Sequence, residues 1–126
     1  MIGGAFALAG LVVLLSFSAF ALSDMCGNKV LWAQWSPDKT HQAAVFVRDC
    51  GATTGYSFHV ALIGRGDDVL ETGNITILEG RQSGVDPRPT VNWSANNQLQ
   101  VTTERSVKFF KREQVVSGVT INYLAR

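Results

Sequence analysis

The clearest alternation of apolar and polar side chains predicts three consecutive antiparallel strands near the start of the chain. Successive side chains of a strand point to opposite faces, so a period of two marks a strand. The first predicted strand, Val30–Trp35, ends at a tight turn over Ser36–Lys39. The second, Ala43–Arg48, is almost equally apolar on both faces, which indicates a central strand covered on both sides. The third is Tyr56–Ile63, with aromatic and aliphatic side chains on one face.

The rest of the chain shows shorter runs of the same kind, separated by turn residues. They predict further strands at Val69–Thr72, Asn74–Leu78, Thr90–Trp93, Gln98–Thr103 and Val115–Leu124. Glu79–Pro89 reads as a surface loop, and Glu104–Gln114 as a bent strand or a short helix. We therefore predict an all-β fold: a single antiparallel β domain of about eight strands, either a sandwich or a partly open barrel. A strand covered on both faces favours the sandwich.

The first residues form an apolar segment with no charged side chain before Asp24. The apolar core and the small residues Ala19 and Ala21 predict a secretory signal peptide over residues 1–21, which leaves 22–126 as one β-rich domain. This segment has no Lys or Arg in its leading region, which departs from the usual signal. The alternative is an uncleaved membrane anchor, because the 22 residues of Ile2–Ser23 are uncharged and long enough to span a bilayer.

Two cysteines follow that segment, Cys26 and Cys50. In an exported protein the expectation is one disulfide, and closing a loop of this length stabilises the fold by about 3.5 kcal/mol. They lack the CxxC spacing of a zinc site, and we expect no metal and no cofactor.

Composition narrows the class of protein. The chain has 126 residues, 46% of them hydrophobic and 17% charged, with a net charge of +1. This is enough for one packed domain and argues against disorder. A nearly neutral chain also lacks the excess of positive charge that is typical of nucleic-acid-binding proteins. The only basic cluster is read as a solvated edge or loop rather than an anion site, and it comprises Arg105, Lys108, Lys111 and Arg112.

The loop between the second and third predicted strands holds the best candidates for recognition. Asp49, Thr53, Thr54 and Tyr56 are predicted to form a binding loop that the disulfide pins. A hydrolase is the alternative, with Asp49 or His59 as general base and a threonine hydroxyl as nucleophile. The simpler interpretation is stronger: Asp49 caps backbone N–H groups and His59 is a surface or satisfied core residue. The sequence leaves catalysis undecided and favours a non-catalytic protein.

Two segments also share a Trp-Ser pair followed by a polar turn, Ala33–Asp38 and Val91–Asn96. Two copies 58 residues apart are too few for a repeat fold. We interpret the likeness as shared hairpin chemistry, in which an indole lies beside a tight turn.

Several short motifs together resemble a family of small exported or lipid-anchored bacterial proteins of uncharacterised function. The motifs are Ser36-Pro37-Asp38-Lys39, Arg48-Asp49-Cys50-Gly51-Ala52-Thr53-Thr54, Gly73-Asn74 and Gly118-Val119-Thr120-Ile121-Asn122-Tyr123. The resemblance implies a bacterial envelope and a β-rich domain, and it implies no activity.

From these observations we expect a periplasmic or otherwise extracytoplasmic binding module whose partner is another envelope protein or a glycan. We expect no contact with nucleic acid, and contact with the membrane only through residues 1–23 if they are retained. A membrane-anchored structural subunit is the second hypothesis, and a hydrolase is the third.

Overall fold

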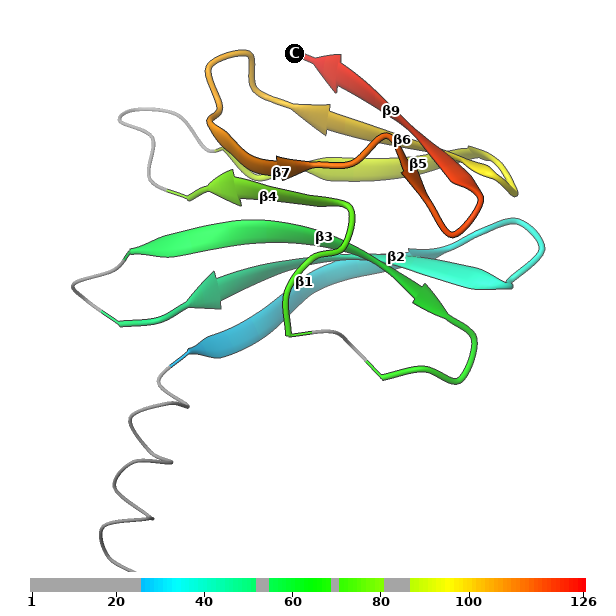
Figure 1. Cartoon of the computed structure of the whole chain (residues 1–126), viewed down its shortest axis with the longest axis horizontal. Helices are drawn as coiled ribbons and strands as arrows, with labels where there is room; N and C mark the ends of the chain where they lie inside the picture. Colours follow the sequence, from blue (N-terminus) through cyan, green and yellow to red (C-terminus); the bar gives the residue numbers. More distant parts are fainter. Residues whose placement is uncertain (1–25, 52–54, 69–70, 81–86) are drawn as a thin grey trace, which may run out of the picture.

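A computed structural model describes residues 26–51, 55–68, 71–80 and 87–126. Within these ranges the chain forms two stacked sheets and no helix (Figure 1). The first sheet has the order β1-β2-β3-β4-β7 and the second has the order β5-β6-β9-β8. The strands are β1 (Gly27–Trp35), β2 (His41–Asp49), β3 (Tyr56–Gly64), β4 (Thr76–Glu79), β5 (Thr90–Ala95), β6 (Gln98–Thr103), β7 (Phe109–Arg112), β8 (Val115–Val116) and β9 (Val119–Ala125). The predicted all-β sandwich is confirmed.

The three-strand unit predicted near the start of the chain forms the centre of the first sheet. β1 and β2 are joined by the expected turn, which the bond from Lys39 N to Ser36 O closes at 2.9 Å. β2 lies between β1 and β3, as its apolar faces predicted. Ala43 and Val45 point into the space between the sheets, and the alternate residues Ala44 and Phe46 are buried on the other face.

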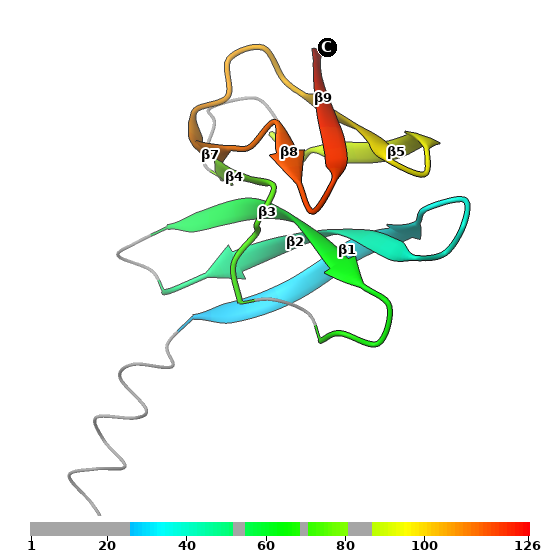
Figure 2. The same cartoon turned by 45° about the vertical axis from the view of Figure 1, so that its right-hand side comes forward.

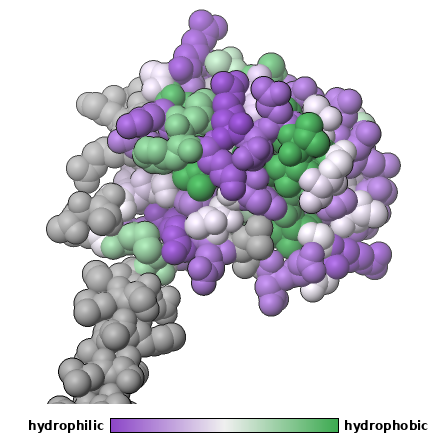
Figure 3. Space-filling model, in the orientation of Figure 1, coloured by the Kyte–Doolittle hydropathy of each residue, from purple (hydrophilic) through white to green (hydrophobic). Residues whose placement is uncertain are grey.

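The main core fills the space between the two sheets. Its side chains come from alternate positions of the inner strands, as the period of a strand requires. The buried members are Ala43, Val45, Val60, Leu62, Ile75, Trp93, Leu99, Val101, Val119 and Ile121. On the face that Figure 3 shows, the described surface is mostly hydrophilic, with apolar patches between the polar side chains.

Residues 71–75, which precede β4, lie on the outer face of the first sheet, the face turned away from the second sheet (Figures 1 and 2). Glu71 O accepts hydrogen bonds from Arg48 Nη1 at 2.8 Å and from Asn28 Nδ2 at 2.9 Å. Asn74 pairs with β3 as a short strand would, because its amide bonds both Leu62 N and Leu62 O. The strand predicted at Val69–Thr72 is wrong for Glu71 and Thr72, which form a bend, and residues 69–70 lie outside the described ranges.

The second sheet departs from the predicted antiparallel pattern at one pair. β6 and β9 run parallel, with Gln98 opposite Thr120 and Thr103 opposite Ala125. The single strand predicted over Val115–Leu124 is also wrong. The chain reverses at Ser117 and Gly118, whose φ angles of 48° and 78° are those of a tight hairpin turn, and so forms β8 and β9.

The looser stretch before that hairpin contributes a strand to the opposite sheet. Residues 109–112 form β7, which pairs with β4 at the edge of the first sheet. The bent strand is therefore confirmed over the helix as the interpretation of this stretch.

The two Trp-Ser hairpins lie side by side across the sandwich. Trp93 Nε1 donates to Gln34 O at 2.9 Å, and Asp38 N donates to Asn96 Oδ1 at 2.9 Å. The likeness between the segments therefore accompanies a direct contact between β1 and β5, which ties one end of the two sheets together.

Candidate functional site

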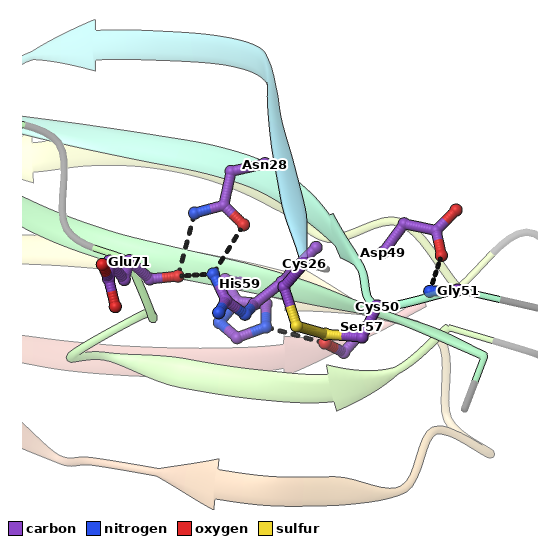
Figure 4. The surroundings of a disulfide bond; sticks show 9 residues. Cys26, Asn28, Asp49, Cys50, Gly51, Ser57, His59 and Glu71 are labelled. Carbon is purple, nitrogen blue, oxygen red and sulfur yellow. Dashed lines mark hydrogen bonds between the residues drawn. A yellow bond between two sulfur atoms is a disulfide. The ribbon is translucent and has the colours of Figure 1, made fainter. Parts of the chain in front are cut away.

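The predicted disulfide is present and closes the open end of the β1–β2 hairpin (Figure 4). Gly27 pairs with Asp49 in the register of these strands. Cys26 and Cys50 are the next two residues outward, so they face each other across the hairpin. Disulfides persist in oxidising compartments, and this one indicates a location outside the cytoplasm.

Hydrogen bonds hold both ends of the loop that follows Cys50. Asp49 Oδ1 accepts a hydrogen bond from Gly51 N at 3.0 Å, which confirms the predicted cap. On the other side Tyr56 O accepts from Gly80 N at 3.0 Å, and the Tyr56 ring covers Gly80 so closely that a Cβ there would lie 2.2 Å from Cδ2.

Asp49 and Tyr56 are directly opposite each other in the register of β2 and β3, so their side chains leave the same face of the sheet. Tyr56 is 39% exposed and packs edge-on against Phe58. Two of the four predicted binding residues thus flank the loop together. The other two, Thr53 and Thr54, lie outside the described residues.

His59 is a buried side chain on the outer face of the first sheet, and both of its ring nitrogens have a hydrogen-bond partner. The residue is 2% exposed, and its ring stacks on Phe46 with 4.9 Å between the ring centroids. Nδ1 accepts a hydrogen bond from Gly73 N at 2.9 Å, and Nε2 lies 2.7 Å from Ser57 Oγ. A backbone N–H can only donate, so Nδ1 carries no proton. The neutral ring therefore holds its proton on Nε2 and donates it to the serine.

Burial is the main reason that this imidazole stays neutral. Desolvation, and secondarily the nearby Arg48 guanidinium, lowers the pKa of His59 to about 4. His59 is therefore a satisfied core residue, in agreement with the simpler of the two sequence interpretations.

In this arrangement His59 is not available as the general base of the hydrolase alternative. In a serine hydrolase the imidazole accepts the hydroxyl proton, whereas His59 donates to Ser57. Asp49 and His59 also leave opposite faces of the sheet, because Asp49 pairs with Tyr56 and His59 pairs with Phe46. Figure 4 shows the Asp49 side chain pointing away from the His59 ring. The structure does not bring Asp49 and His59 together, and the threonine of this alternative, Thr53, lies outside the described residues.

A second group of side chains, where β7 faces β9, was not predicted from the sequence. The Arg112 guanidinium lies over the ring of Phe109 at 4.8 Å and over that of Tyr123 at 4.6 Å. Tyr123 Oη donates to Glu113 O at 2.5 Å, and burial raises the pKa of Tyr123 to about 12. Arg112 belongs to the cluster that we interpreted as a solvated edge. Tyr123 comes from the other sheet, so no local sequence signal joins it to Arg112.

The described ranges show neither a cluster of metal ligands nor a membrane-spanning helix. No group of three or more His, Cys, Asp or Glu side chains there is close enough to hold a metal ion. The same ranges contain no helix that is long and apolar enough to cross a membrane. The signal or anchor predicted for residues 1–23 lies outside them.

Comparisons with protein-family models, with curated proteins and with solved structures gave no match. The resemblance to a family of small exported bacterial proteins therefore stays a prediction from the motifs alone.

Proposed function

We propose that this protein is an exported, non-catalytic binding module that recognises its partner through the loop between β2 and β3. One observation carries the proposal: both ends of that loop are fixed. The disulfide holds Cys50 against Cys26, Asp49 caps Gly51, and Tyr56 packs on the backbone of Gly80. Fixed loop ends reduce the conformational entropy that binding has to overcome, so they favour recognition.

The side chains at the base of the loop suit a polar partner with some apolar surface. Asp49 offers carboxylate oxygens, and Tyr56 offers a half-exposed ring with a hydroxyl at its tip. Thr53 and Thr54 add two hydroxyl groups by their chemistry. Another envelope protein or a glycan fits this set, whereas the chain's net charge of +1 gives no preference for nucleic acid.

Export and a bacterial envelope location belong to the same proposal. The disulfide supports an oxidising compartment, and the apolar segment at residues 1–21 supports a signal peptide. Intact mass of the native protein, with and without reduction and alkylation, tests this. A chain that starts at Leu22 or Asp24, with two thiols only after reduction, is expected. A full-length chain would instead support an anchor over residues 1–23.

Alanine variants test the recognition loop. We expect alanine at Asp49, Thr53, Thr54 or Tyr56 to weaken partner binding about tenfold or more, as residues at the centre of an interface do. Arg65→Ala and Asp67→Ala are the matched controls, because both residues are polar, exposed and in the other connecting loop of β3.

The assay is affinity capture from bacterial envelope fractions and binding to arrayed envelope glycans, with thermal unfolding to confirm that each variant is folded. Equal losses from the two loops would contradict the proposal. A loss confined to the control loop would contradict it as well.

A further inference from the structure

β9 has one edge that the described chain leaves open. β8 pairs with it only at Val119 and Thr120, and after the bond from Ile121 N to Gln114 O at 2.8 Å the chain turns away toward β7. No described strand pairs with Tyr123–Ala125 on this side. An unpaired edge presents backbone donors and acceptors that an added strand can use.

The alternation of the backbone shows which groups face outward. Thr120 N and Arg126 N donate to Asn97 O and Thr103 O on the β6 side, at 2.9 Å each. Successive N–H groups of a strand point to opposite sides, so the N–H and C=O groups of Tyr123 and Ala125 point to the open side.

A groove runs along this edge. It consists of two adjoining hollows of about 190 Å³ and about 520 Å³, which share Arg112, Tyr123 and Leu124 in their walls. The smaller hollow reaches Arg105, and the larger reaches Val115. The groove therefore follows β9 from its pairing with β8 to its end.

The groove has a positively charged wall with a pre-positioned guanidinium. Phe109 and Tyr123 hold the Arg112 guanidinium by their ring faces, and this guanidinium forms no hydrogen bond or ion pair with any described residue. The acidic side chain in the wall, Glu104, is already bound by Arg126 Nε at 2.7 Å. A stacked guanidinium with free N–H groups matches the two oxygens of a carboxylate.

The outer side of the same edge carries two exposed apolar side chains among polar ones. Val115 is 61% exposed and Leu124 is 49% exposed. Their neighbours Val116 and Tyr123 pack on the core, so Val115 and Leu124 point away from it. A strand added here would place one side chain toward Arg112 and the next toward this apolar side.

We propose that the open edge of β9 binds an extended acidic segment of another protein by strand addition. The backbone of the segment pairs with Tyr123 and Ala125, a carboxylate side chain binds Arg112, and its apolar neighbours pack on Leu124 and Val115. The proposal goes beyond the recognition loop between β2 and β3 and does not depend on it, because no described residue of that loop lines the groove.

The test uses the full chain and a fluorescent, end-blocked hexapeptide in which valine and glutamate alternate. A second peptide carries glutamine in place of glutamate, and binding is followed by fluorescence anisotropy. Arg112→Gln removes the charge, with Arg65→Gln as the matched control on an exposed loop. Ala125→Pro removes an N–H on the open edge without touching the β6 side, and Ala125→Val is its control.

We expect saturable binding of the glutamate peptide and about tenfold weaker binding after Arg112→Gln, since a charge-assisted pair is lost. Ala125→Pro should weaken binding severalfold, with a lost backbone bond as the cause. The two controls and the fold, followed by thermal unfolding, should change little. Arg112→Lys keeps the charge but lacks the planar fork, so an intermediate loss is expected and provides a second test.

Three kinds of result would overturn the proposal. One is no saturable binding, or equal binding of the glutamine peptide. Another is full displacement by inorganic phosphate together with no effect of Ala125→Pro, which would reduce the groove to a simple anion site. The third is a dimer of the chain that Ala125→Pro dissociates, because the edge would then bind a second copy.

Discussion

The buried imidazole of His59 predicts a specific loss of stability in mild acid. The folded chain favours the neutral ring, and the unfolded chain protonates it at its ordinary pKa of 6.5. Between that value and a folded pKa of about 4 the unfolded state binds more protons, so the free energy of unfolding falls as the pH falls. The contribution is complete above pH 6.5 and is lost as the pH approaches 4.

The size of the effect follows from the two pKa values. Their difference corresponds to about 3 kcal/mol, lost progressively across this window. That is a large part of the 5 to 15 kcal/mol, roughly, that stabilises an ordinary domain. Asp38 also changes stability in acid, because hydrogen bonds from Ser36 and then Thr40 lower the pKa of its carboxyl group. A comparison of two chains is therefore needed to isolate the histidine.

The comparison is between the wild-type chain and His59→Asn, which offers an acceptor to Gly73 and cannot titrate. Urea unfolding at a series of pH values from 7.5 to 4 gives the two stability curves. We expect the variant to be less stable at neutral pH, since it loses the stacking on Phe46, and to lose about 3 kcal/mol less between pH 7 and pH 4. Parallel curves would refute the argument, as would a His59 pKa near 6.5 measured by NMR.

Two further changes test the packing of the first sheet. Gly73→Ala would place a Cβ 2.7 Å from Val60 O, and we expect a loss of about 2 kcal/mol in urea unfolding, whereas Gly27→Ala meets no atom within 4 Å and should change little. Equal stability of the two variants would contradict the crowded environment of Gly73. Replacing both Cys26 and Cys50 with alanine should lower the free energy of unfolding by about 2 to 4 kcal/mol, because the unfolded chain gains the freedom of the opened loop. An unchanged unfolding midpoint would contradict this.

Local chemistry accounts for the parts of the fold that the sequence predicts well. The turn at Ser36–Lys39 and the strands on either side of it depend on neighbouring residues, and the apolar faces of β2 reveal its central position. The Ser117-Gly118 turn had a usable signal too, since a Ser-Gly pair often marks a turn. The alternation of Val115–Leu124 as one strand obscures this signal.

The rest depends on contacts between residues far apart in the chain, which one sequence does not display. The parallel pairing of β6 with β9 is one such contact. The face of β3 on which His59 lies was predictable from alternation, but its partner Gly73 belongs to the segment that crosses the outer face. The Arg112 guanidinium is likewise held by the ring of Tyr123, which belongs to the opposite sheet.

The position of β9 between β6 and β8 has a consequence for the way the chain folds. The first three strands are neighbours in sequence, and their hairpins can form early through short loops. The second sheet cannot close in the same way, because Gln98 has to pair with Thr120, 22 positions further along. Contacts between distant residues form slowly. One edge of β6 therefore keeps its backbone N–H and C=O groups unpaired until β9 arrives, and an unpaired edge is a site where another chain can pair and start aggregation.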